Sequence, residues 1–118
     1  MILLVDINVD GQGFSAMLIE SAMIPEWIRT GKQVNLVFKE TEVSLAKNLS
    51  GLISMRNRIK CTVEHIERGE LLSKISLRFQ KYTLTSAITT RSVDMLDLKI
   101  GDEVEALVKA NEVSLMKN

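Results

Sequence analysis

The sequence predicts an all-β protein that is built from two related units in tandem. Three observations support this prediction: several segments alternate apolar and polar residues, Gly-containing turns separate them, and one stretch of the chain recurs 70 residues later. At 118 residues, 46% of them apolar, the chain is globular and holds one ordinary domain or two very small ones. Units of about 60 residues have thin cores, so they are expected to share a core or to oligomerise.

The first half of the chain contains a predicted hairpin, an irregular connection and two further strands. Residues 5–10 alternate strictly, and a Gly-Gln-Gly turn precedes the returning strand. The only proline of the chain lies within residues 23–28, which are expected to be an irregular or edge segment. Residues 42–48 fit either a strand or a helical turn by pattern alone, and the repeat described below favours a strand. The expected strands of this half are 5–10, 14–19, 33–39 and 42–48.

The second half contains one long predicted strand, a second hairpin, a short helix and two closing strands. The alternation over residues 57–68 slips once near His65, which indicates a β-bulge. Near-helical spacing of apolar residues within 90–98, after a Thr90 or Ser92 cap, predicts one or two helical turns. About five strands and one short helix per complete unit predict a small closed or nearly closed antiparallel barrel of the OB type. The expected strands of this half are 57–68, 71–79, 82–89, 103–109 and 112–116.

The two halves are related by a tandem duplication. Residues 30–48 align with residues 100–118 without a gap, and nine of the nineteen aligned positions are identical. The predicted boundaries are a partial repeat over 1–49, with its barrel truncated, and a complete repeat over 50–118. The partial repeat is expected to lack the counterpart of the segment around Ser54 and a hairpin's length. We therefore expect it to complete its barrel with a strand from a neighbouring subunit.

The charge and cysteine content exclude several classes of protein. Fifteen basic residues balance fifteen acidic ones, which removes the electrostatic argument for non-specific binding to nucleic acids or membranes. The charge is uneven, since residues 1–48 carry four basic and six acidic residues and residues 49–118 carry eleven and nine. A single cysteine, Cys61, excludes an intramolecular disulfide, and no Cys/His cluster has metal-ligand spacing. With no signal-peptide pattern and no apolar run of about 20 residues, a soluble cytoplasmic protein is expected.

Two short polar segments contain the candidate functional residues: Ser54-Met55-Arg56-Asn57, and Lys109-Ala110 near the end of the chain. A doubly charged oxyanion needs hydrogen-bond donors and positive charge in a dry cavity, and hydroxyl, guanidinium, ammonium and backbone N–H groups supply both. The guanidinium can bind two oxygens, the ammonium acts as a point charge, and a small residue such as Ala110 lets its backbone N–H approach the ion. In an arbitrary sequence Arg56 and the basic residues after it would be a solvated strand face, and the second motif favours a function for Arg56 only.

These two segments, joined by the Gly-Asp-Glu-Val turn at 101–104, resemble the Mop (molbindin, TOBE-related) domain family. The family pattern is S-A-R-N, then a G-D-E-V-type turn and a strand that ends in K-A or K-S. The resemblance covers the second repeat throughout and only the latter half of the pattern in the first. The whole arrangement is similar to the paired Mop domains at the C-terminus of molybdate ABC-transporter ATPases and to free-standing molbindins.

The resemblance implies that molybdate or tungstate binds in pockets at subunit or domain interfaces, with no other cofactor. Met55 replaces the usual Ala of the family, and it would contribute only its backbone N–H to the ion. The residues to which the resemblance assigns oxyanion binding are Ser54, Met55, Arg56, Asn57, Lys109 and Ala110.

The first repeat is expected to form no equivalent site. Lys39 aligns with Lys109, but Glu40 stands where the second repeat has Ala110. A carboxylate beside a dianion in a partly buried site costs several kcal/mol at an effective dielectric constant of about 20.

The main functional hypothesis is a non-catalytic cytoplasmic protein that binds molybdate or tungstate for molybdenum storage and homeostasis, as a homo-oligomer with ligand sites at its interfaces. The alternative is a regulatory oxyanion-sensing domain of a molybdate ABC-transporter ATPase, with transporter subunits as partners; the chain itself contains no G-x-x-x-x-G-K-S/T loop. An OB-like nucleic-acid-binding module is disfavoured by five aromatic residues and zero net charge. No nucleophile–base or acid–base constellation indicates an enzyme. Neither a nucleic-acid partner nor membrane insertion is expected.

Overall fold

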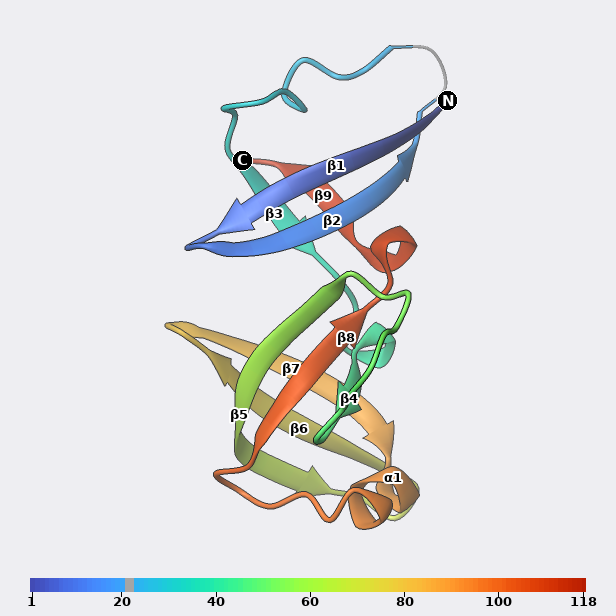
Figure 1. Cartoon of the computed structure of the whole chain (residues 1–118), viewed down its shortest axis with the longest axis vertical. Helices are drawn as coiled ribbons and strands as arrows, with labels where there is room; N and C mark the ends of the chain where they lie inside the picture. The colour runs from blue at the N-terminus through green and yellow to red at the C-terminus, as the bar shows by residue number, and fades with distance from the viewer. Residues whose placement is uncertain (21–22) are drawn as a thin grey trace.

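The computed structural model describes residues 1–20 and 23–118 as an elongated, two-lobed molecule of 46 × 29 × 26 Å (Figure 1). The described residues form nine strands, one short α-helix and two turns of 3₁₀-helix. The prediction of an all-β chain with a single short helix is therefore confirmed.

The lower lobe of Figure 1 is a five-stranded antiparallel sheet with the order β4-β8-β5-β6-β7. Its strands are β4 (Ser44–Ala46), β5 (Asn57–Arg68), β6 (Leu72–Phe79), β7 (Tyr82–Thr89) and β8 (Glu103–Val108). The sheet curls because the long strand β5 pairs with β8 through its first half and with β6 through its second half. The register shifts between Val63 and His65, which confirms the predicted bulge. The Ser86 hydroxyl on β7 donates to the Val43 carbonyl just before β4, at 2.6 Å, and so links the two edges of the sheet.

The helix α1 (Thr90–Met95) follows β7 at the base of this lobe (Figure 1). Its N-cap is Thr89, whose Oγ1 accepts a hydrogen bond from the Ser92 backbone N–H at 3.2 Å. The predicted Thr90 or Ser92 cap is therefore wrong. Thr90 is buried instead, and its hydroxyl donates to the Gly69 carbonyl at 2.8 Å, so it is not available as a cap.

The upper lobe contains two two-stranded antiparallel sheets. One is the hairpin of β1 (Ile2–Val9) and β2 (Gln12–Ile19), and the other pairs β3 (Val34–Val37) with β9 (Ser114–Lys117). The connection at 23–28 contains no strand, as its proline predicted.

Each element of the first repeat, from β1 to β4, has a counterpart 70 residues later in the second repeat, from β5 to β9. The pairs are β1 with β6, β2 with β7, β3 with β8, the 3₁₀ turns η1 (Glu40–Glu42) with η2 (Ala110–Glu112), and β4 with β9. The hairpin turns match as well, because Asp10 and Gln80 both have positive φ angles, 48° and 54°. The expectation that the first repeat lacks a hairpin is therefore wrong. Within the described residues, the strand without a counterpart is β5.

The two repeats exchange their last strands. In Figure 1, β4 of the first repeat lies beside β8, and β9 of the second repeat lies beside β3. Leu45 lies opposite Ala106 in one ladder and Leu115 lies opposite Leu36 in the other, so the two ladders have the same register after the 70-residue offset. The first repeat thus pairs with β9 of its own chain, and a further strand from a neighbouring subunit stays a prediction.

A continuous hydrophobic core joins the repeats. Phe14 and Ala16 on β2 belong to the same buried cluster as the apolar residues of the five-stranded sheet. The ring of Phe14 packs edge-to-face on that of Phe79, with their centroids 6.4 Å apart. The two small units therefore share a core, as their size predicted.

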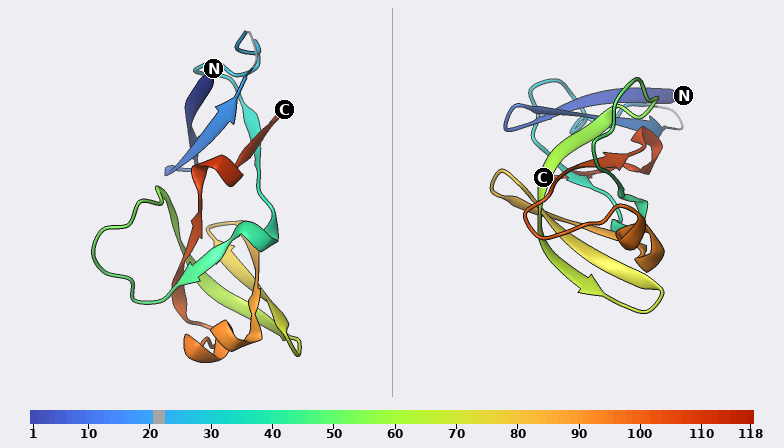
Figure 2. Two further views of the ribbon diagram at one scale, coloured as in Figure 1. Left: turned by 90° about the vertical axis from the view of Figure 1, so that its right-hand side faces the viewer. Right: turned by 60° about the horizontal axis from the view of Figure 1, so that its bottom comes forward.

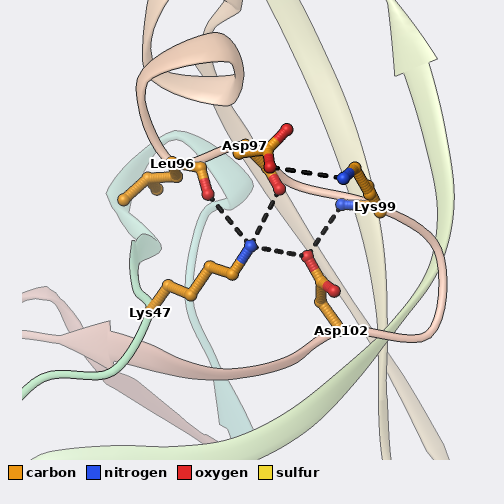
Figure 3. A network of polar contacts seen from close by, with 5 residues as sticks. All are labelled: Lys47, Leu96, Asp97, Lys99 and Asp102. Atoms are coloured by element: carbon orange, nitrogen blue, oxygen red, sulfur yellow. Dashed lines mark hydrogen bonds and ion pairs between the residues drawn. The ribbon is translucent and has the colours of Figure 1, made fainter.

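A lysine fixes the exchanged strand β4 to the second repeat (Figure 3). Lys47 follows β4, and its ammonium donates to the carbonyls of Leu96 and Asp97, at 3.1 and 2.8 Å, and to the carboxylate of Asp102 at 3.0 Å. The Lys99 backbone N–H donates to the same carboxylate at 2.9 Å. The hydrogen bond from Lys47, followed by the one from Lys99, lowers the pKa of Asp102 below its ordinary value of 3.8.

Replacing Lys47 with Met should make stability less dependent on pH at the acid end. Since the pKa of Asp102 is lower in the folded chain, its pair with Lys47 stabilises the fold above pH of about 4 and is lost as the pH falls below that value. Urea unfolding from pH 7 to pH 2 should therefore show a wild-type advantage over K47M that shrinks on acidification. Lys81→Met, which removes a more exposed partner of Asp10 at 3.8 Å, is the control. A K47M deficit that is constant with pH would contradict the assignment.

Candidate functional site

The two predicted segments meet at the seam between the lobes, where the ladder of β5 and β8 ends. Asn57 lies opposite Val108 in the first pair of this ladder. Arg56 precedes Asn57 and Lys109 follows Val108, so their backbones adjoin immediately beyond the last pair. The register of β5 and β8 therefore brings the S-x-R-N segment beside the Lys109-Ala110 turn within one chain.

Asn57 is fully buried, and its side chain connects three strands. Its Oδ1 accepts from the Ser15 backbone N–H at 2.7 Å, and its Nδ2 donates to the Ser15 carbonyl at 2.9 Å and to the Val108 carbonyl at 3.0 Å. Ser15 belongs to β2 of the other repeat. The amide of Asn57 is thus engaged by backbone groups, and it holds the first repeat, β5 and β8 together rather than facing solvent.

The remaining predicted residues lie at the surface around this buried amide. Ser54, Arg56 and Lys109 are exposed, while Met55 and Ala110 are half-buried. The left view of Figure 2 shows the loop from β4 to β5, which contains the Ser54 segment, standing out from the barrel. The structure thus places Arg56 and Lys109 at exposed positions next to the Asn57–Val108 pair that ends the ladder.

The positive charges at this seam differ in their pairing. Among the ion pairs of the described residues, none involves Arg56 or Lys109. Arg58, by contrast, forms a bidentate pair with Glu105, with N–O distances of 2.9 and 2.8 Å. This hydrogen bonding lowers the pKa of Glu105 below its ordinary value. Arg58 is therefore neutralised within the sheet, whereas no ion pair of the described residues neutralises Arg56 or Lys109.

The turn that carries Lys109 has the same backbone geometry as its counterpart in the first repeat. The Lys109 carbonyl accepts from the Glu112 N–H at 2.9 Å, and the Lys39 carbonyl accepts from the Glu42 N–H at 2.9 Å. The side chains after the lysines differ, since Glu40 replaces Ala110 and pairs with Lys74 at 3.2 Å. The two turns therefore have the same backbone geometry but different side chains after the lysine.

Ser15 is a partner of Asn57 that the sequence did not reveal. Its backbone N–H and carbonyl, not its side chain, bind the Asn57 amide. A backbone contact does not depend on residue type. The sequence could therefore indicate it only through the expected position of Ser15 in a strand of the other repeat.

The single cysteine is not placed for thiolate chemistry. Cys61 is buried, and burial raises the pKa of its thiol to about 11, so the thiol remains protonated at neutral pH. Within the described residues, no three His, Cys, Asp or Glu side chains cluster as a metal site would require. The described part of the chain also contains no helix with the length and apolar character needed to cross a bilayer.

The fold and the seam together define a tandem module of small OB-like barrels whose repeats share strands. The chain belongs to the TOBE domain family, since the model of the TOBE domain matches residues 53–115, more than half of its length. This confirms the family that the two motifs indicated.

Two relatives show where such modules occur. The chain is 43% identical over 81 residues to the molybdenum import ATP-binding protein ModC of Brucella abortus (strain 2308), a match that covers 68% of this chain and 23% of ModC. It is 31% identical over 108 residues to the molybdenum-pterin-binding protein MopB of Rhodobacter capsulatus, a match that covers 90% of this chain and 40% of MopB. The chain thus spans less than half the length of either relative.

Two solved structures have a similar fold. The cytoplasmic molybdate-binding protein ModG, in a form with molybdate bound, superposes with a TM-score of 0.78 at 28% identity, over 92% of this chain and 78% of ModG. A molybdate-binding protein from Sporomusa ovata superposes with a TM-score of 0.50 at 45% identity, over 51% of this chain and 90% of that protein. These similarities confirm the predicted tandem OB-like architecture.

Replacing Asn57 with Ala should destabilise the chain by about 2–4 kcal/mol, because it leaves three buried backbone groups without their partner. Urea unfolding monitored by circular dichroism measures this loss. Asn35→Ala, at an exposed position of β3, is the matched control and should change stability by less than about 0.5 kcal/mol. Equal effects of the two substitutions would show that the Asn57 bridge is not a major contact.

Proposed function

We propose that this chain is a non-catalytic binding protein for tetrahedral metal oxo-dianions, molybdate or tungstate. The observation that supports this proposal most directly is the end of the β5–β8 ladder, where the S-x-R-N segment adjoins the Lys109-Ala110 turn. Arg56 and Lys109 together carry two positive charges, which match a dianion. The TOBE family and the relatives named for molybdate or molybdenum support the same class of ligand.

Each proposed ligand contributes a donor of a different kind. The guanidinium can bind two oxygens at once, and the ammonium provides a point charge. Asn57 acts as a positioning residue, because its buried amide fixes the start of β5 against Val108 and Ser15. The proposed ligands are the Ser54 hydroxyl, the Arg56 guanidinium, the Lys109 ammonium and the backbone N–H groups of Met55 and Ala110.

A second subunit is proposed to cover the site, as part of a homo-oligomer. Two unit charges about 4 Å apart attract by about 1 kcal/mol in water and by about 4 kcal/mol at an effective dielectric constant of about 20. With Ser54, Arg56 and Lys109 exposed, an uncovered site would bind an anion weakly. Leu52 and Ile53 expose apolar side chains directly before the motif, which suits a surface that packs against another subunit.

In the cell, we infer a cytoplasmic role in molybdenum storage and homeostasis. The alternative is an oxyanion-sensing regulatory module that acts with a molybdate transporter ATPase. The match to part of ModC, an ATP-binding import protein, favours keeping this second candidate. Purified chain that binds molybdate but does not associate with transporter subunits would favour storage over regulation.

Arg56→Ala should weaken molybdate binding by about tenfold or more, because a charge-assisted hydrogen bond contributes about 1.5–3 kcal/mol. Isothermal titration of wild type and variant with molybdate, tungstate and sulfate measures this effect. Lys60→Ala, which removes an exposed positive charge further along β5, is the control and should change the affinity little. Absence of dianion binding by the wild type would overturn the proposal, and equal losses in the two variants would reduce it to non-specific attraction.

Glu40→Ala should leave the number of bound ions per chain unchanged. The variant removes the repelling carboxylate beside Lys39, but the described residues supply no S-x-R-N strand next to that turn. The stoichiometry of a molybdate titration tests this. One additional ion per chain in E40A would show that the charge of Glu40 alone blocks a second site.

A further inference from the structure

The outer face of the β5–β8 ladder carries a row of charged side chains that begins at the candidate anion site. Successive residues of a strand point to opposite faces of a sheet. Asn57 and Val108 are buried in the core, so by this alternation Arg56 and Lys109 lie on the outer face. Arg58 is the next residue of β5 on that face. Residues two apart on a strand are separated by about 7 Å, so the charge of Arg58 is near enough to act on an anion at the site.

Glu105 cancels the charge of Arg58. Arg58 lies opposite Leu107 in the ladder and Glu105 lies opposite Lys60, so the pair runs diagonally across the two strands and away from the seam. The guanidinium donates two hydrogen bonds to the carboxylate, at 2.9 and 2.8 Å, and only 29% and 19% of the two side chains are exposed. The hydrogen bond from Arg58 lowers the pKa of Glu105, so the carboxylate stays ionised at neutral pH. An anion at the seam therefore meets Arg58 and Glu105 as a neutral pair.

The other acidic residue of β8, Glu103, has no such role. Glu103 lies on the same face, two residues further from the seam, opposite Thr62. None of the ion pairs of the described residues includes it. Of the two carboxylates on this strand, Glu105 is thus the one that is joined to a cation beside the candidate site.

We propose that Glu105 is a specificity-determining residue of the oxyanion site and that it acts through Arg58: it sets how steeply the affinity of the site rises with the charge of the ligand. This role rests on the proposed function. The Coulomb energy between a fixed charge and an ion is proportional to the charge of the ion, so an uncovered Arg58 would favour a dianion twice as strongly as a monoanion. With Arg58 covered, Arg56 and Lys109 act on the ion, and a bound dianion is released more readily than from a site with three uncovered cations.

Glu105→Gln uncovers the charge of Arg58. A unit charge about 7 Å away in water should strengthen the binding of a dianion about sevenfold and that of a monoanion about threefold. Isothermal titration at low ionic strength, with molybdate and with the tetrahedral monoanion perrhenate, measures both affinities. The ratio of the molybdate affinity to the perrhenate affinity should therefore rise about threefold. Glu103→Gln is the matched control, because it removes the same charge from the same face without uncovering a cation, and it should leave the ratio unchanged.

Arg58→Met makes the opposite change, because it leaves the carboxylate of Glu105 uncovered. It should lower the affinity for molybdate more than the affinity for perrhenate. The double variant R58M/E105Q removes both charges and should return the ratio to that of the wild type. A purely structural contribution of the pair would instead change the two single variants in the same direction, and the double variant would not restore the ratio.

Failure of this role and failure of the proposed function give different results. Absence of molybdate binding by the wild type would overturn the proposed function, and the role of Glu105 with it. Molybdate binding by the wild type with an unchanged ratio in E105Q, or with an equal change in E103Q, would overturn the role of Glu105 alone. If E105Q fails to fold, R58M decides the question, because an unchanged ratio in that variant would also overturn the role.

Discussion

The reciprocal exchange of β4 and β9 is the constraint on which the rest of the structure depends. Each repeat pairs with the last strand of the other, and the two units, too small for separate cores, share one. The exchange also creates the seam, because β8 leaves the lower lobe through η2 and continues as β9 in the upper one. At that crossing Asn57 reaches the backbone of Ser15, and the predicted anion ligands surround the crossing.

Strand positions were predictable because burial on one face of a sheet imposes a period of two on the side chains. The bulge at His65 was predictable for the same reason, since an extra residue interrupts that period. The counterpart of the β6–β7 hairpin was missed because residues 1–29, aligned with residues 71–99 by the 70-residue offset, are identical at no position. The equivalence survives in the backbone, as at Asp10 and Gln80 with positive φ, and in the alternation of apolar side chains. The exchange was not predictable, because ladder hydrogen bonds join backbones and residue types do not name the partner strand.

The residues of the candidate site also differ in how far the sequence could predict their roles. Arg56 and Lys109 were identifiable from residue type and motif, and the ladder of β5 and β8 brings their segments together. The side chain of Asn57 has a different place from the one its motif implied: it is buried, and the backbones of Ser15 and Val108 occupy it. Sequence reasoning identifies groups that can bind an anion, but it cannot separate them from a polar group that the fold needs for its own backbone.

The two repeats have the same backbone arrangement around the turns at Lys39 and Lys109, but they differ by one strand and by the side chain after the lysine. At one end β5 brings an S-x-R-N segment beside Ala110, and at the other a groove without a strand lies near Glu40, whose carboxylate pairs with Lys74. A dianion at the same end would still face the carboxylate of Glu40. The duplication therefore kept the backbone geometry of both turns but the candidate anion-binding side chains of only one.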